Sequence, residues 1–137
     1  MTVKQISVFL ENQPGKLAEF TKLLKAYNIN LRALTIAEAS DFGIIRVIVD
    51  DAYNAATVIK DNDYICKITN VIAAELKDEP GALADMITIL GENDVNVEYM
   101  YACAGTDNKA YMILKVENVE ATVGVLEKNG IRLSTSI

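Results

Sequence analysis

The residues best suited to bind a small molecule form a short run near the N-terminus, where a Pro-Gly pair separates two apolar stretches. The run consists of Glu11, Asn12, Gln13, Pro14, Gly15, Lys16 and Leu17. The Pro-Gly pair predicts a tight turn, and the apolar spacing after it predicts the start of a helix. The N–H groups at a helix start and the helix dipole favour a small anion or a carboxylate. Lys16 would add a positive charge there.

The same run also has a purely structural interpretation. Asn12 would cap the helix, Pro14 would fix the chain near the first turn, and Gly15 would relieve a tight backbone. The run lacks the glycine and lysine spacing of a phosphate-binding loop and the spaced glycines of a dinucleotide fold. A nucleotide is therefore a poor candidate, and an amino acid or another carboxylic acid fits the run better.

The composition argues against several functional classes. The chain has 137 residues, 51% of them hydrophobic, which is typical of a globular protein. It contains no histidine, which excludes histidine-based triads and metal sites, and its net charge of −6 argues against binding nucleic acid. Cys66 and Cys103 lie too far apart for a C-x-x-C motif. We expect two buried, reduced thiols, no metal and no cofactor.

The sequence also predicts where the protein acts. The first residues do not have the pattern of a secretion signal, and no apolar run reaches the roughly 18 residues that a membrane span needs. The serines have no base partner within the sequence, and no spacing predicts an acid–base pair. We expect a cytoplasmic protein that is not an enzyme and does not bind a membrane.

The Pro-Gly run occurs twice. Residues 10–18 recur as residues 76–84, an offset of 66 that becomes 67 after residues 41–43. One extra residue in a turn would explain this change. The only two prolines, Pro14 and Pro80, occupy equivalent positions. The sequence therefore predicts two domains, residues 1–69 and 70–137.

Each repeat predicts the order strand, helix, strand, strand, helix, strand. In the first repeat the strands are residues 3–10, 31–40, 44–49 and 64–69, and the helices are residues 17–27 and 53–60. In the second repeat the strands are residues 71–76, 95–104, 110–116 and 131–135, and the helices are residues 83–92 and 119–128. This βαββαβ order predicts an α+β protein of two ferredoxin-like repeats, each with helices on one face of an antiparallel sheet.

The alternation of side chains predicts which face of each sheet the helices cover. Val8 and Leu10 should face the helices while Phe9 points away, and Met100 should point inward while Val97 points outward. The faces away from the helices would then carry aromatic and aliphatic side chains, which indicates burial against the other repeat or another chain. We expect a homodimer.

The repeated motifs resemble the ACT domain, a small amino-acid-sensing module. In the first repeat the resemblance rests on residues 10–18, 27–31 and 43–47, and in the second on residues 78–84 and 93–97. The two copies cover essentially the whole chain, which is similar to the stand-alone tandem ACT proteins.

The resemblance implies regulation by a ligand rather than catalysis. ACT domains typically pair side by side and bind amino acids at the seam, where the turn asparagine and the asparagine that opens the second strand contact the ligand from partner domains. These positions are Asn12 and Asn30 in the first repeat. In the second repeat Asn96 is kept, but Asp78 replaces the turn asparagine. The aspartate either favours a ligand amine or marks a turn that no longer binds, and both interpretations stay open.

The resemblance makes both turns and both strand-opening asparagines candidate ligand-binding residues. They are Asn12, Gln13, Pro14, Gly15, Lys16, Leu17, Asn30, Asp78, Pro80, Gly81, Ala82, Leu83 and Asn96. The first 69 residues hold eight basic and eight acidic residues, while the other 68 hold five and eleven. A zwitterion could place its carboxylate near Lys16 and its amine near Asp78 or Glu98. The alternative is that these charges are solvated and only keep the protein soluble.

We therefore interpret the chain as a non-catalytic regulatory protein that binds an amino acid or related small carboxylate at the seam between ACT domains. Because the chain carries no catalytic domain, its target would be a separate protein, which the resemblance suggests is an enzyme or a transporter. The alternative is a structural module that has lost the ligand and regulates a partner enzyme by protein–protein contact. A small enzyme on the same scaffold fits less well.

Overall fold

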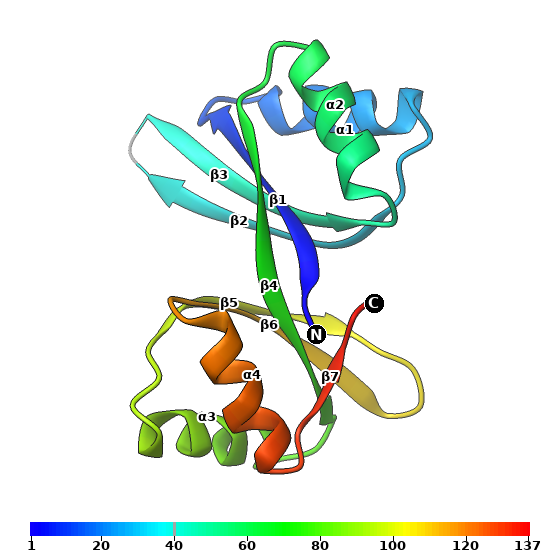
Figure 1. Cartoon of the computed structure of the whole chain (residues 1–137). Helices are drawn as coiled ribbons and strands as arrows, with labels where there is room; N and C mark the ends of the chain where they lie inside the picture. Colours follow the sequence, from blue (N-terminus) through cyan, green and yellow to red (C-terminus); the bar gives the residue numbers. More distant parts are fainter. Residues whose placement is uncertain (40) are drawn as a thin grey trace. The chain divides into compact units, whose positions relative to one another are not determined.

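The computed structural model describes residues 1–39 and 41–137 and consists of strands and helices in two similar successions (Figure 1). The first is β1 (Val3–Glu11), α1 (Lys16–Ala26), β2 (Leu31–Ala39), β3 (Phe42–Val49), α2 (Ala52–Asp61) and β4 (Cys66–Lys77). The second continues from β4 with α3 (Ala82–Glu92), β5 (Val97–Ala104), β6 (Lys109–Val116), α4 (Val119–Lys128) and β7 (Arg132–Ser134). The predicted end of the second strand, Ser40, lies outside the described residues.

The chain divides into two compact units. The N-terminal unit is Lys4–Thr69, and the C-terminal unit is Asn70–Ile137 together with Met1–Val3. The boundary falls within β4, a single strand of 12 residues where the sequence predicted two. The prediction was wrong on this point because residues 66–77 contain neither proline nor glycine to interrupt the strand.

Each unit has the topology predicted from the repeats. The strand order is β2-β3-β1-β4 in the N-terminal unit and β5-β6-β4-β7 in the C-terminal unit. The pairings of β3 with β1 and β2, and of β6 with β4 and β5, are antiparallel. In Figure 1, α1 and α2 lie on one face of the first sheet, and α3 and α4 on one face of the second. The predicted fold class, two ferredoxin-like βαββαβ units, is confirmed.

The strand register matches residue for residue between the units. Phe9 pairs with Ile44 and Glu11 with Phe42 in the N-terminal unit. In the C-terminal unit Glu75 pairs with Tyr111 and Lys77 with Lys109. These pairs reproduce the offset of 66 before the hairpin and of 67 after it, so positions can be compared directly between the units.

The buried cores also correspond. The N-terminal core is built from Ile6, Val8, Leu10, Phe20, Leu24, Ile45, Val47, Val49, Ala52, Ala55, Ala56 and Ile59. The C-terminal core is built from Ile72, Ala74, Leu76, Met86, Leu90, Met112, Leu114, Val116, Leu126 and Leu133. Each set joins one face of a sheet to the apolar stripes of two helices, which is the main source of stability for such a unit.

One predicted alternation is wrong, at the start of β5. The pairing of β5 with β6 shifts register between Val97 and Tyr99. Val97 therefore packs against the helix-side core instead of pointing away from it. Met100 lies opposite Leu114 on the helix side, as expected, yet is 38% exposed because β5 is an outer strand of its unit.

Candidate functional site

The two Pro-Gly runs form the same turn at the start of α1 and α3. The Lys16 N–H donates to the Gln13 carbonyl oxygen at 3.3 Å, and Gly15 has φ 87°. The Ala82 N–H donates to the Glu79 carbonyl oxygen at 3.4 Å, and Gly81 has φ 92°. These values define type II turns, which require a positive φ at the third position and therefore glycine. The Pro-Gly pair thus sets the backbone before each helix.

The structure corrects the predicted role of Asn12. Gly15 is the N-cap residue of α1, and no side chain caps this helix. Instead, the Asn12 N–H donates to the Asp41 carbonyl oxygen at 3.1 Å, and the Asp78 N–H donates to that of Asn108 at 2.8 Å. Each strand–helix turn is therefore tied to the neighbouring hairpin loop.

The helix starts are exposed and present backbone donors. The first helical hydrogen bond of α1 runs from the Glu19 N–H to the Gly15 carbonyl oxygen, at 3.0 Å, so the N–H groups of Leu17 and Ala18 precede it. The Lys16 ammonium lies 3.5 Å from the Glu19 carboxylate, a surface ion pair that leaves it accessible. In the C-terminal unit Ala82 replaces this lysine, so the two turns differ in charge.

The strand-opening asparagines lie at the other end of the helices. Because α1 has 11 residues, about 16 Å of helix separates Asn30 from the turn that contains Asn12. Asn30 lines a shallow pocket of about 390 Å³ beside Lys25 and Asn28. Neither unit therefore gathers all of its candidate residues at one place. The turn and the strand-opening asparagine of one unit form two separate exposed sites.

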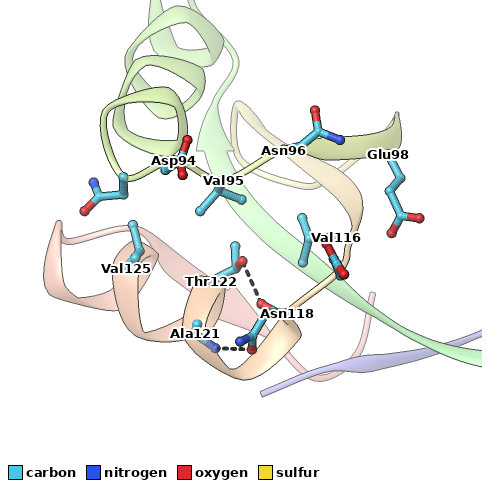
Figure 2. Close-up of a pocket in the computed structure, with 11 residues that line it drawn as sticks. Asp94, Val95, Asn96, Glu98, Val116, Asn118, Ala121, Thr122 and Val125 are labelled. Atoms are coloured by element: carbon cyan, nitrogen blue, oxygen red, sulfur yellow. Dashed lines mark hydrogen bonds between the residues drawn. The ribbon is translucent and has the colours of Figure 1, made fainter.

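Asn96 lines a larger pocket of about 580 Å³ in the C-terminal unit, between the α3–β5 and β6–α4 connections (Figure 2). Its lining includes the carboxylates of Asp94, Glu98 and Glu117 and the amides of Asn93, Asn96 and Asn118. Asn118 is fixed as the cap of α4, because its Oδ1 accepts from the Ala121 N–H at 3.0 Å. The Thr122 hydroxyl donates to the Asn118 carbonyl oxygen at 2.8 Å.

The corresponding place in the N-terminal unit is charged differently. Arg32 and Asp50 stand where the C-terminal unit has Glu98 and Glu117, and the Arg32 Nε donates to the Asp50 carboxylate at 2.7 Å. This hydrogen bond raises the pKa of the Arg32 guanidinium. In the C-terminal unit the Lys115 ammonium lies 2.9 Å from Glu98 instead. The C-terminal pocket is therefore the more acidic and favours a cationic group.

A third pocket, of about 370 Å³, lies beside the first turn in the N-terminal unit. Its walls include Phe9, Phe42 and Tyr64, and Lys16 contributes from the turn. This pocket was not predicted from the sequence, because its walls come from residues far apart along the chain. The exposed Phe9 was the available signal, since it interrupts the expected polar face of β1.

The cysteines do not form a disulfide, and they are only partly buried where the sequence predicted buried thiols. Burial raises the pKa of the Cys66 thiol, an effect that Lys60 opposes, and burial also raises the pKa of the Cys103 thiol. Both thiols are therefore poor nucleophiles near neutral pH.

Within residues 1–39 and 41–137, no three Cys, Asp or Glu side chains come together as a metal site. The same ranges contain no helix with the length and apolar character needed to cross a membrane.

The family model described as an ACT domain pair matches residues 1–134. The chain belongs to the ACT domain pair family. The predicted resemblance is thereby confirmed over nearly the whole sequence.

Solved structures with the ACT pair fold include protein BT0572 from Bacteroides thetaiotaomicron, with a TM-score of 0.91 and 41% identity over 98% of this chain and 92% of that one. The regulatory subunits of aspartate kinase from Thermus thermophilus and Thermus flavus have TM-scores of 0.62 and 0.63 at 14% and 16% identity. Each likeness covers 91% of this chain, together with 91% of the Thermus thermophilus subunit and 90% of the Thermus flavus subunit. At this identity the likeness concerns the fold. No curated protein matches the sequence.

Proposed function

We propose that this ACT domain pair is a non-catalytic regulatory protein that binds an amino acid or a related small carboxylate at the seam between ACT domains. Residues 1–69 and 70–137 would each form one ACT domain. Ligand binding would favour one arrangement of the domains and so change the surface offered to a separate target enzyme or transporter.

The observation that carries this proposal is the exposed type II turn at the start of α1. It presents the N–H groups of Leu17 and Ala18, the positive end of the helix dipole and the Lys16 ammonium at one place. These groups suit a carboxylate. Regulatory subunits of aspartate kinase share the fold, which supports a regulatory role.

The separation of the turn from Asn30 supports assembly. Because these groups lie at opposite ends of α1, a ligand contacting both kinds of group needs a second ACT domain. The outer strand β2 exposes Leu34 and Ile36, which are 40% and 48% accessible, and β5 exposes Met100. Exposed apolar side chains on an outer strand favour pairing with another chain. We propose that a second copy of this chain covers them in a homodimer.

The proposal places the protein in the cytoplasm. Cys66 and Cys103 are free thiols, and free thiols are typical of proteins from reducing compartments.

A thermal-shift screen against the twenty amino acids and a set of aromatic acids tests the proposal. A specific ligand present at 100 times its dissociation constant should add about 2.7 kcal/mol to the unfolding free energy. If no compound raises the melting midpoint and a target protein still binds tightly, the ligand-free interaction module is correct instead. Turnover of a carboxylate by the pure protein would contradict the non-catalytic part of the proposal.

A further inference from the structure

The pocket beside the first turn, called here the first-turn pocket, has apolar walls and a charged rim. It is lined by Phe9, Leu10, Glu11, Lys16, Glu19, Phe42, Asp63, Tyr64 and Ile65. The Phe9 and Phe42 rings lie 5.9 Å apart and are 44% and 43% exposed, while Ile65 is 71% exposed. All of these residues belong to the N-terminal unit, so this unit forms the pocket by itself.

The C-terminal unit has an ion pair at the equivalent place. By strand register, Glu75 stands where Phe9 does and Lys109 where Phe42 does, and their charged groups lie 3.0 Å apart. The fold therefore tolerates polar side chains at both positions. The exposed aromatic pair is a property of the N-terminal unit that packing of the fold does not require.

Two further positions also differ between the units. Ala82 replaces Lys16 at the helix start, so the C-terminal turn lacks the ammonium group. By the offset of 67, Arg132 stands where the exposed Ile65 does. The C-terminal turn thus lacks the lysine at the helix start, the aromatic pair and the exposed isoleucine, and has charged side chains in place of the apolar ones.

The rim of the first-turn pocket carries both signs of charge. Lys16 lies at the helix start, where a carboxylate is favoured, and Glu11 and Asp63 supply carboxylates that suit an ammonium group. Burial raises the pKa of the Tyr64 phenol, Glu19 adds to this effect and Lys16 opposes it. The phenol therefore lies within the field of both charges. An apolar wall with groups of both signs beside it matches a zwitterion that carries an apolar side chain.

We propose that the first-turn pocket holds the side chain of an amino acid bound at the first turn, so that the ligand has an aromatic or branched aliphatic side chain. Of the two units formed by residues 1–39 and 41–137, only the N-terminal one provides this site, which sets the stoichiometry at one ligand per chain. This inference rests on the proposed function and adds the class of amino acid and the unit that selects it.

Calorimetric titration of the full-length protein tests the preference. Phenylalanine and leucine should each bind at least about tenfold more tightly than alanine, because the pocket buries their additional apolar atoms. Phenylpropionate and phenethylamine, which each lack one charged group, should bind more weakly than phenylalanine. The expected stoichiometry is one per chain.

The double variant Phe9→Glu with Phe42→Lys introduces the ion pair of the C-terminal unit and should abolish the preference for phenylalanine over alanine. The milder variant Phe42→Ala should reduce it, and circular dichroism checks that each variant folds. The matched control, Glu75→Ala with Lys109→Ala, alters the equivalent place in the C-terminal unit and should leave both affinity and preference unchanged.

The outcomes separate the two proposals. Wild-type protein that binds alanine as tightly as phenylalanine overturns this inference and leaves the proposed function intact. A preference for phenylalanine over alanine that survives in the folded Phe9→Glu, Phe42→Lys variant also overturns this inference and leaves the proposed function intact. The side chain of the ligand would then lie elsewhere. If no amino acid binds the wild-type chain, the proposed function and this inference both fail.

Discussion

At the scale of single residues, Gly15 and Gly81 determine the shape of the two strand–helix turns. Their φ values are 87° and 92°, and a Cβ atom added at either glycine would meet nothing within 4 Å. Substitution by alanine is therefore opposed by backbone strain and not by a clash. The sequence predicted these turns correctly because a type II turn has a local cause, the Pro-Gly pair itself.

We expect Gly15→Ala to lower the unfolding free energy by about 1 kcal/mol, because an L side chain is strained at positive φ. Urea unfolding measures this change. The control is Gly124→Ala within α4, where a Cβ atom also meets nothing within 4 Å. This substitution should raise the unfolding free energy by about 0.5–1 kcal/mol. Equal effects of the two substitutions would contradict the assigned turn.

The cysteines provide a pH-dependent prediction. Because burial raises the pKa of both thiols, Cys66 and Cys103 should react with iodoacetamide at pH 7.5 more slowly than free cysteine. The raised pKa also means that the unfolding free energy falls as the pH rises through the range in which the thiols ionise. Mass spectrometry follows the labelling, and the urea-unfolded chain serves as the control. Labelling of the folded chain at the free rate would show that the thiols are not shielded.

At the scale of elements, α2 and α4 have side-chain caps, whereas α1 and α3 begin at glycine turns. The Asp51 carboxylate accepts from the Asn54 N–H at 3.1 Å, and the Asn118 amide oxygen accepts from the Ala121 N–H at 3.0 Å. The capped helices are thus fixed by side chains, while α1 and α3 begin at Gly15 and Gly81 without a side-chain cap.

We expect Asn118→Ala and Asp51→Ala each to lower the unfolding free energy by about 1 kcal/mol, because each leaves a helix start without its acceptor. Thermal unfolding measures the loss. Lys22→Ala on the exposed face of α1 serves as the control and should change stability by less than about 0.5 kcal/mol. Caps that can be removed without loss would contradict the role assigned to them.

The sequence predicted the elements well where the signal is local. The limits of α4 agree with the prediction, whereas the predicted strands on either side of Asn70 form the single strand β4. The outward direction predicted for Val97 was wrong because a register shift between paired strands leaves no sign in the strand's own alternation. The pocket beside the first turn was missed because its walls also depend on how distant segments pair. Phe9, Phe42 and Tyr64 meet only after pairing and packing bring them together.

At the scale of the whole molecule, the proposed homodimer depends on the outer strands. We expect Leu34→Lys with Ile36→Lys to shift the protein from dimer to monomer in analytical ultracentrifugation, because the charges would have to be buried at the interface. The control is Tyr53→Lys, which changes an exposed residue of α2 that is 64% accessible. A dimer that withstands the β2 substitutions would mean that the chains pair through another surface.

The central claim is that an amino acid or related carboxylate binds through the strand–helix turn and the strand-opening asparagine of ACT domains. The most direct test is calorimetric titration of the wild-type protein and of the Asn12→Ala, Asn30→Ala variant with the ligand that the thermal-shift screen identifies. We expect the variant to keep its fold and to lose affinity by about tenfold or more, since two side-chain hydrogen bonds to the ligand are removed. Unchanged affinity in the folded variant would rule out this binding mode, because the ligand would then bind outside this site.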